Sequence, residues 1–326
     1  MALLGEFELI ARYFTQPVRR AALGVGDDCA LLTVAPGMTL AISSDMLVEG
    51  RHFLSTVAPE RLGHKALAVN LSDLAACGAR PLAFSLSFAL PAADEAFLAP
   101  FARGLLALAE RHDCELIGGD TTRGPLTISI TAYGEVPTGA GLLRSGARAG
   151  DDLYVSGTLG DARLALEVFR GTAAVAGDAF ARIRRAMEEP LPRVELGQAL
   201  LGIASSAIDL SDGLAGDLGH VLRRSGVGAV VEVDALPRSA DLAGQDPALQ
   251  RECLLAGGDD YELLFTAAPD RRDAVAVAAR AASTPVARIG RIEAGSVLRF
   301  VDAAGQAVAG PAGSFDHFLT TSSAAP

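Results

Sequence analysis

Aspartate residues beside glycine or serine recur at six places in this sequence. These places are Gly24–Asp28, Ser44–Asp45, Ser72–Asp73, Gly118–Asp120, Asp209–Gly213 and Gly257–Asp260. Adjacent carboxylates repel each other, so solvent, backbone N–H groups or a cation must compensate for the repulsion. Glycine permits tight turns and the close approach of another group. A solvated turn explains any one of these blocks, but their recurrence predicts that the turns converge on one site.

The side chains in these blocks are the oxygen ligands that a hard cation takes. The carboxylates are those of Asp28, Asp45, Asp73, Asp120, Asp209 and Asp212, and the hydroxyl groups beside them are those of Ser43, Ser44, Thr121 and Ser211. Such oxygens suit Mg²⁺, which commonly bridges to substrate phosphates. The glycines expose backbone N–H groups that can hold phosphate oxygens. The pattern predicts Mg²⁺-dependent phosphoryl transfer, in which catalysis is mostly positioning and charge neutralisation.

The net charge and the missing motifs exclude other classes of protein. The formal charge is 28 − 39 = −11, which argues against binding to nucleic acid or to an anionic membrane. No apolar run approaches the roughly 20 residues of a membrane span, and the first residues do not resemble a signal peptide. We therefore expect a cytoplasmic protein whose nucleotide ligands arrive with cations.

Motifs for several other chemistries are also missing from the sequence. It contains no Walker phosphate loop, no G-x-G-x-x-G, no G-x-S-x-G and no H-x-x-x-H. Its four cysteines form no C-x-x-C pair, so neither a zinc site nor a disulfide framework is indicated. Zinc hydrolases and serine hydrolases are therefore poor candidates.

Capping is the structural alternative for some of these aspartates. Asp209 or Ser211 alone could cap the helix that follows, and we weigh capping and ligation equally for either residue. Asp161 is predicted to be an N-cap. Asp73 is harder to explain structurally, because it lies on an alanine- and leucine-rich helix where an unpartnered carboxylate is costly.

The chain is long enough for two domains, and its periodicity predicts an α/β first half. The composition changes between 137 and 150, so we expect an N-terminal domain at 1–137, a C-terminal α+β domain at 150–320 and a frayed tail at 321–326. Helices are predicted over 5–14, 59–79, 96–111, from 161, 194–205 and 214–225, and strands over 40–44, 82–90, 126–136, 152–156, 228–233, 261–266, 287–292 and 297–301. Asn70 and Asp73 are three residues apart and are predicted to share one face of the 59–79 helix.

Six ordered blocks together resemble the thiamine-monophosphate kinases. They are Gly24–Asp28, Ser44–Phe53, Asn70–Ala79, Gly118–Gly124, Ala207–Leu214 and Gly257–Leu263, and the resemblance extends from about Gly5 to Phe318. The wider superfamily includes aminoimidazole ribonucleotide synthetase, selenophosphate synthetase and a hydrogenase maturation factor.

The resemblance implies a function and a fold. The implied reaction is direct, in-line transfer of the γ-phosphoryl group of ATP to thiamine monophosphate, which gives thiamine diphosphate in the last step of its biosynthesis. The implied fold is the two-domain, aminoimidazole ribonucleotide synthetase-like α/β and α+β fold. In it, the N-terminal sheets of a homodimer pair into a barrel, with the active sites near the dimer interface.

The resemblance also implies roles for individual residues. The magnesium ligands would be Asp28, Ser43, Ser44, Asp45, Asp73, Asp120, Asp209 and Asp212; the ATP-binding residues would be Gly119, Asp120, Arg144 and Ser211; and the substrate-binding residues would be His52, Asp259 and Phe315. An aromatic side chain suits the cationic thiazolium ring. No covalent or general-base residue is implied. Asp28 is expected to bind magnesium, whereas Asp27 is expected to support the turn through backbone hydrogen bonds or to make an outer-shell contact.

Two alternatives to the kinase stay open on the sequence. One is another ATP-using synthetase of the same superfamily, and the other is a non-catalytic module that binds magnesium and nucleotide. The blocks Gly118–Gly124 and Gly257–Leu263 argue against the first alternative.

Overall fold

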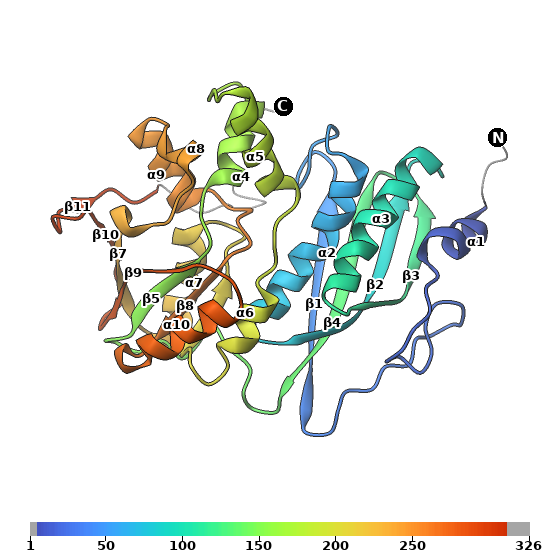
Figure 1. Cartoon of the computed structure of the whole chain (residues 1–326), viewed down its shortest axis with the longest axis horizontal. Helices are drawn as coiled ribbons and strands as arrows, with labels where there is room; N and C mark the ends of the chain where they lie inside the picture. The colour runs from blue at the N-terminus through green and yellow to red at the C-terminus, as the bar shows by residue number, and fades with distance from the viewer. Residues whose placement is uncertain (1–4, 312–326) are drawn as a thin grey trace. The chain divides into compact units, whose positions relative to one another are not determined.

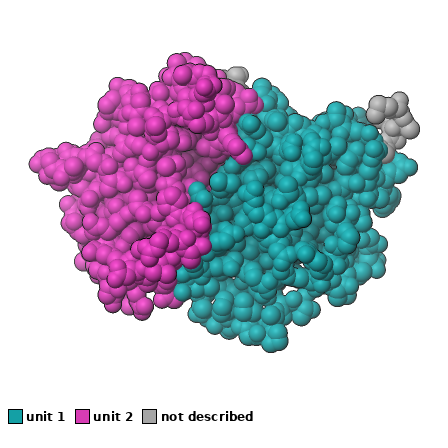
Figure 2. Space-filling model, viewed as in Figure 1, with its two compact units in different colours: residues 1–141, 188–201 teal, residues 142–187, 202–326 magenta. Residues whose placement is uncertain are grey.

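The structure, a computed structural model that describes residues 5–311, divides into two compact units. Figure 2 colours them separately. Unit 1 contains the chain up to Gly141 and also Glu188–Leu201, and unit 2 contains Leu142–Met187 and the chain from Gly202. The first division lies inside the composition change at 137–150. The segment Glu188–Leu201 instead joins the earlier part of the chain.

Unit 1 is built on a four-stranded sheet in the order β1-β4-β2-β3. The strands are β1 (Met38–Val48), β2 (Arg80–Leu90), β3 (Glu115–Arg123) and β4 (Thr127–Pro137). β2 and β3 are parallel, and the other pairs are antiparallel. The sheet is open, so the barrel implied by the resemblance is not formed within one chain.

Two long helices cover one face of this sheet, as Figure 1 shows. They are α2 (Pro59–Ala76) and α3 (Glu95–Arg111). Pro59 begins α2, where its missing N–H is no loss, and Gly78 follows the helix end with a φ of 70°. Both ends were predicted from the sequence within a few residues. Asp94 caps α3 by accepting a hydrogen bond from the Ala96 N–H at 2.9 Å.

Glycines let α2 and α3 approach closely. A Cβ atom on Gly104 would lie 1.8 Å from the carbonyl oxygen of Glu60, and one on Gly63 would lie 2.0 Å from that of Phe101. Both distances are far below van der Waals contact, so each glycine is required by the opposite helix.

The second face of the sheet, which we call the open face, is partly apolar and exposed. Side chains alternate along β1, so that Leu40, Ile42 and Met46 lie on the open face and are 41%, 60% and 56% exposed. One end of the face is covered by residues 18–34, which pack around Ala83 and Ile117. The part near β1 remains open in the chain described here.

The remaining helices of unit 1 are short. They are α1 (Glu6–Leu9), a π-helical turn (Ile10–Phe14) and α6 (Val194–Ala199). The helix predicted over 5–14 is therefore α-helical only in its first turn, and the one predicted over 194–205 ends at Ala199. α6 packs on α2, where a Cβ atom on Gly197 would lie 2.0 Å from the Ala75 carbonyl oxygen.

Unit 2 is built on a seven-stranded sheet in the order β11-β10-β7-β9-β5-β8-β6. The strands are β5 (Asp152–Ser156), β6 (Ser206–Asp209), β7 (Gly228–Glu232), β8 (Leu263–Ala267), β9 (Val286–Glu293), β10 (Leu298–Val301) and β11 (Ala307–Val308). The helices are α4 (Asp161–Phe169), α5 (Gly177–Glu188), α7 (Leu214–Ser225), α8 (Ala240–Ala243), α9 (Pro247–Ala256) and α10 (Arg272–Ala281), with 3-10 turns at Val233–Ala235 and Pro269–Arg271.

Two sequence predictions about turns and caps were wrong. The Ser43–Asp45 block lies inside β1, because that strand extends further than predicted. The Gly118–Asp120 block lies inside β3, where no strand was predicted. Asp161 is the first residue of α4, and Gly160 is its N-cap with a φ of 89°. The Asp161 carboxylate instead accepts a hydrogen bond from the Ser239 hydroxyl at 2.6 Å.

Replacement of Gly104 tests the close contact between α2 and α3. Because its Cβ would overlap the Glu60 backbone, we expect Gly104→Ala to lower the free energy of unfolding by about 1–3 kcal/mol. Gly177→Ala, where no atom lies within 4 Å of the added Cβ, is the matched control. Urea denaturation followed by circular dichroism measures both, and equal stabilities for the two variants would contradict the packing argument.

Candidate active site

In unit 1, α2 runs back along β1 and forms a line of polar contacts with it. The Ser43 hydroxyl donates a hydrogen bond to the Asp73 carboxylate, and the Asp45 backbone N–H donates to Asn70 Oδ1 at 3.2 Å. Asn70 is 1% exposed and also donates to the Ala66 carbonyl oxygen at 3.1 Å. We call this line of contacts the α2–β1 seam. The shared helix face of Asn70 and Asp73, predicted from their spacing, is thus what joins them to β1.

The seam ends beyond β1 at the turn that contains His52. The Val48 backbone N–H donates to His52 Nδ1 at 3.0 Å, and Lys65 Nζ donates to the His52 carbonyl oxygen at 3.2 Å. Lys65 lies on α2 and is 2% exposed. Lys65 was not predicted to be a site residue, because a single lysine on a helix does not by itself indicate burial.

The seam does not include every predicted ligand of unit 1. Alternation along β1 places Ser44 on the open face, where its hydroxyl lies 3.0 Å from that of Thr131. Asp120 lies on β3, at the opposite edge of the sheet. It is paired with Ser87 of β2, which is paired with Ser129 of β4, and these paired residues lie on the open face. Three strand spacings separate β1 from β3, which is about 14 Å. One chain therefore does not bring Asp120 to Asp45 and Asp73.

Gly119, predicted to approach the nucleotide, has a packing role. Its φ is 147°, and a Cβ atom on it would lie 1.8 Å from the Leu86 carbonyl oxygen of β2. No atom lies within 4 Å of the corresponding position on Gly118. Gly119 is thus required by the neighbouring strand, and Gly118 is the more open of the two.

The Gly24–Asp28 block forms a tight, exposed turn. Gly26 has a φ of 123°, and isolated bridges join Val25 to Asp27 and Leu23 to Leu31. The Asp28 backbone N–H donates to Asp27 Oδ1 at 2.8 Å. The expected division of roles is confirmed for Asp27, which supports the turn; the ligand role of Asp28 stays a prediction.

In unit 2, the capping explanation fails for both Asp209 and Ser211. Asp209 is the last residue of β6 and is 4% exposed. α7 begins at Leu214, its N-cap is Gly213, and no side chain caps it. Asp209 and Ser211 thus remain candidates for ligand binding.

A further carboxylate holds this loop and was not predicted. Asp217, on the first turn of α7, is 3% exposed and accepts a hydrogen bond from the Asp212 backbone N–H at 3.1 Å. Burial, together with the charge of Asp212, raises the pKa of Asp217 to about 7. The nearby positive charge of Arg144 opposes this rise, so Arg144 lies on the Asp212 side of unit 2.

The Gly257–Leu263 block lies against the same loop. The Asp259 N–H donates to the Ser211 carbonyl oxygen, and the Tyr261 N–H donates to that of Leu210, both at 2.8 Å. Asp259 and Tyr261 have φ values of 59° and 49°, a conformation that costs energy outside glycine.

The side chains of this block take different partners. The Tyr261 hydroxyl donates to Asp259 Oδ1 at 3.0 Å, whereas Asp260 Oδ1 accepts from the Gly160 N–H at 2.8 Å. Burial raises the pKa of Asp260, and the negative charges of Glu262 and Asp161 raise it further. Asp260 therefore ties this block to the start of α4, and Asp259 stays the candidate for substrate.

The oxygens of each unit fit a hard cation in chemical type. Ser43 and Asp73 present a hydroxyl and a carboxylate in direct contact. Asp209 ends β6, and Ser211 and Asp212 follow it in the loop before α7. Between residues 5 and 311, no three histidine, cysteine or acidic side chains gather closely enough to hold a metal ion. Mg²⁺ ordinarily takes only one or two protein carboxylates, with water and phosphate oxygens as its other ligands. Phe315 lies outside the described residues.

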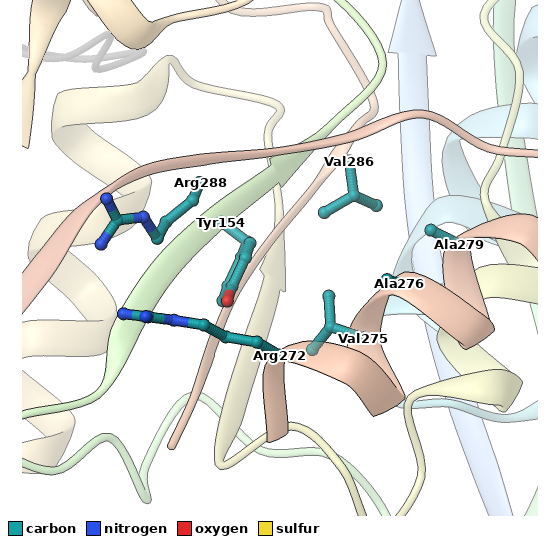
Figure 3. Close-up of a pocket in the computed structure, with 7 residues that line it drawn as sticks. All are labelled: Tyr154, Arg272, Val275, Ala276, Ala279, Val286 and Arg288. Atoms are coloured by element: carbon teal, nitrogen blue, oxygen red, sulfur yellow. The ribbon is translucent and has the colours of Figure 1, made fainter. Parts of the chain in front are cut away.

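A pocket of about 370 Å³ in unit 2 contains none of the predicted site residues. Figure 3 shows Tyr154 between the side chains of Arg272 and Arg288, beside the apolar surface of α10. Both arginines donate to Asp152, which is 2% exposed, with Arg272 at 2.6 and 2.9 Å and Arg288 at 3.2 Å. We interpret the pair as structural, because it neutralises a buried carboxylate.

Comparison with known proteins identifies the family. Residues 26–136 match the AIR synthase related protein N-terminal domain, and residues 148–303 match its C-terminal domain. The thiamine-monophosphate kinase of Salmonella typhimurium is 48% identical over 97% of this chain and 99% of the relative. The chain belongs to the thiamine-monophosphate kinase family. It is therefore an enzyme, and its class is that of the kinases.

Solved structures agree with this assignment. The thiamine-monophosphate kinase of Stenotrophomonas maltophilia K279a has a TM-score of 0.83 and 44% identity, over 93% of this chain and 96% of that one. AaThiL, solved in complex with AMPPCP and TMP, has a TM-score of 0.76 and 31% identity, over 88% and 89% of the two chains. The thiamine-monophosphate kinase family thus shares the two-domain α/β architecture of this chain. Across the part of the chain that the structure describes, no helix has the length and apolar character needed to span a membrane.

Replacement of Asp152 tests the structural role of the arginine pair. Hydrogen bonds from Arg272 hold the pKa of Asp152 below its ordinary value, although burial opposes them. The ion pair therefore stabilises the folded chain above the unfolded-state pKa of Asp152, and this stabilisation is lost as the pH falls through the folded-state pKa of Asp152. We expect Asp152→Asn to cost about 1–3 kcal/mol at neutral pH, with solvent screening of the half-exposed arginines favouring the lower end.

The measurement is urea denaturation across a pH series. The difference between Asp152→Asn and the unchanged chain is expected to shrink in acid. The exposed Asp273→Asn is the control and is expected to change stability by no more than about 0.5 kcal/mol. A difference that persists unchanged at low pH would contradict the proposed ion pair.

Proposed function

We propose that this enzyme transfers the γ-phosphoryl group of ATP directly, in line, to the phosphate of thiamine monophosphate, which yields thiamine diphosphate and ADP. This would be the last step of thiamine diphosphate biosynthesis, in the cytoplasm. The observation that supports the proposal most strongly is the near full-length identity with thiamine-monophosphate kinases. AaThiL, which binds TMP and the ATP analogue AMPPCP, supports the choice of both substrates.

Several Mg²⁺ ions would be held by six carboxylates, with the hydroxyl groups of Ser43 and Ser44. The proposed ligands are Asp28, Asp45, Asp73, Asp120, Asp209 and Asp212. Bound Mg²⁺ supplies neutralisation of the phosphate charge during transfer. A chain of formal charge −11 needs such neutralisation to bind a polyanion at all.

The chain itself would bind and orient the two substrates. Gly119, Asp120, Arg144 and Ser211 are proposed for ATP, and the loop held by Asp217 would fix the position of Ser211. His52, Asp259 and Phe315 are proposed for thiamine monophosphate. Tyr261 would orient the Asp259 carboxylate through the hydrogen bond between them.

A homodimer would complete the site. β1 and β3 are the two edge strands of the sheet in unit 1, and edge strands offer backbone groups for pairing. If β1 of each copy pairs with β3 of the other, two open sheets close into one barrel. That pairing would also place β3 of one copy, which carries Asp120, beside β1 of the other copy, which carries Asp45. The exposed apolar side chains of the open face support burial on assembly.

The activity and the roles of the aspartate pair are tested in one experiment. Purified protein with ATP, Mg²⁺ and thiamine monophosphate is expected to form thiamine diphosphate, quantified by HPLC, and excess EDTA is expected to abolish the product. Asp28→Asn should lower kcat/KM by about 100-fold, and Asp27→Asn by about tenfold or less, because Asp27 bonds the turn. Lack of product over a range of Mg²⁺ concentrations would disprove the proposed function. Equal losses in the two variants would disprove the division of roles.

The proposed dimer is tested at the open face. Ile42 is 60% exposed, so Ile42→Asp should leave the folded chain intact and place two charges in the dimer interface. Light scattering after size exclusion is expected to show a mass near twice 33.5 kDa for the natural sequence and near 33.5 kDa for the variant. Val277→Asp, at a 56% exposed position of α10, should remain dimeric. A monomeric natural sequence would refute the assembly.

A further inference from the structure

Lys65 is the only lysine in the chain. The other 27 of the 28 lysine and arginine residues are arginine. Lysine is among the side chains least often buried, yet Lys65 is 2% exposed. Burying an ammonium group is costly unless polar partners replace its water. A chain that uses arginine for every other strong cation thus keeps its one lysine at a buried position beside the candidate site.

One contact of Lys65 is with a proposed substrate residue. Its Nζ donates to the His52 carbonyl oxygen at 3.2 Å and so joins α2 to the turn after β1. Inside that turn, the His52 N–H donates to the Val48 carbonyl oxygen at 3.0 Å, and the Gly50 N–H donates to that of Phe53 at 2.9 Å. The position of the His52 ring therefore depends on the turn and on its attachment to the helix.

The hydrogen bonds also define the form of the His52 ring. Because Nδ1 accepts from the Val48 N–H, a neutral imidazole has its proton on Nε2. Nε2 is then a donor, which is the form that suits a phosphate oxygen. The turn thus selects a tautomer as well as a position.

The seam has opposite charges at its two ends. Asp73 lies at the Ser43 end, and Lys65 lies eight residues earlier on the same helix, at the His52 end. An ammonium is a compact point charge, whereas a guanidinium is a broad planar fork. A nearly solvent-free position against a backbone carbonyl suits the smaller group.

We propose that Lys65 is a positioning residue for the phosphorylated substrate: it fixes the His52 turn and provides fixed positive charge for a phosphate monoester dianion. This rests on the proposed function, in which thiamine monophosphate is the phosphate monoester. Little fixed positive charge is otherwise assigned to the proposed site, where Arg144 in unit 2 is assigned to ATP.

Steady-state kinetics test the proposal with three variants. Lys65→Met keeps the apolar stem and is expected to raise KM for thiamine monophosphate about tenfold, with KM for ATP changed by no more than about twofold. Lys65→Arg keeps the charge, so its KM for thiamine monophosphate should lie between those of Lys65→Met and the natural sequence. Arg103→Met removes one charge from an exposed position of α3 and should leave both constants unchanged. An unchanged KM for thiamine monophosphate in Lys65→Met, or equal rises in both constants, would overturn the proposal.

A second measurement uses the natural sequence and does not depend on a variant that folds. Because the chain has one lysine, labelling with [ε-¹³C]lysine gives a single side-chain resonance. That resonance is expected to shift on titration with thiamine monophosphate, and to shift less with thiamine, which lacks the phosphate. Equal responses to the two compounds, or no response to either, would refute the role of Lys65. Failure of the turnover assay alone would refute the kinase activity, since the NMR titration reports binding independently.

Discussion

The repulsion between carboxylates in an acidic chain is the constraint on which this structure depends. Uncharged donors contact carboxylates in both units: the Ser43 hydroxyl bonds Asp73, the Asp212 N–H bonds Asp217 and the Tyr261 hydroxyl bonds Asp259. Such donors stabilise a carboxylate while its charge remains available to a cation. Asp152 lies outside the candidate site and differs from these carboxylates, because two arginines form ion pairs with it and neutralise its charge.

Glycines make these arrangements compact, and their roles differ from block to block. Gly119 lies against the backbone of β2, and a Cβ atom on Gly213 would lie 2.9 Å from the Ala256 carbonyl carbon. Gly26, in contrast, has open space around that position and a φ of 123°. A glycine in a block that resembles a ligand motif is thus often required by packing, and only some of these glycines are free to admit a ligand.

Local features of the chain were predictable, whereas relations across the sheet were not. The proline and glycine at the ends of α2, and the common face of Asn70 and Asp73, follow from rules that act within a few residues. The separation of Asp120 from Asp45 depends on the strand order, and the opposite directions of Ser43 and Ser44 depend on their being inside a long strand. Lys65 and Asp217 were missed because one charged residue in a helix has the same sequence signature whether it is buried or exposed.

The return of Glu188–Leu201 to unit 1 has a consequence for how the chain folds during synthesis. α6 supplies packing for the Ala75 turn of α2, yet it is made more than a hundred residues later. The surface of α2 that receives α6 therefore stays uncovered while residues 142–187 of unit 2 leave the ribosome. Unit 1 can therefore be completed only after Leu201 has been made, when the first segment of unit 2 has already been synthesised and the rest of unit 2 has not.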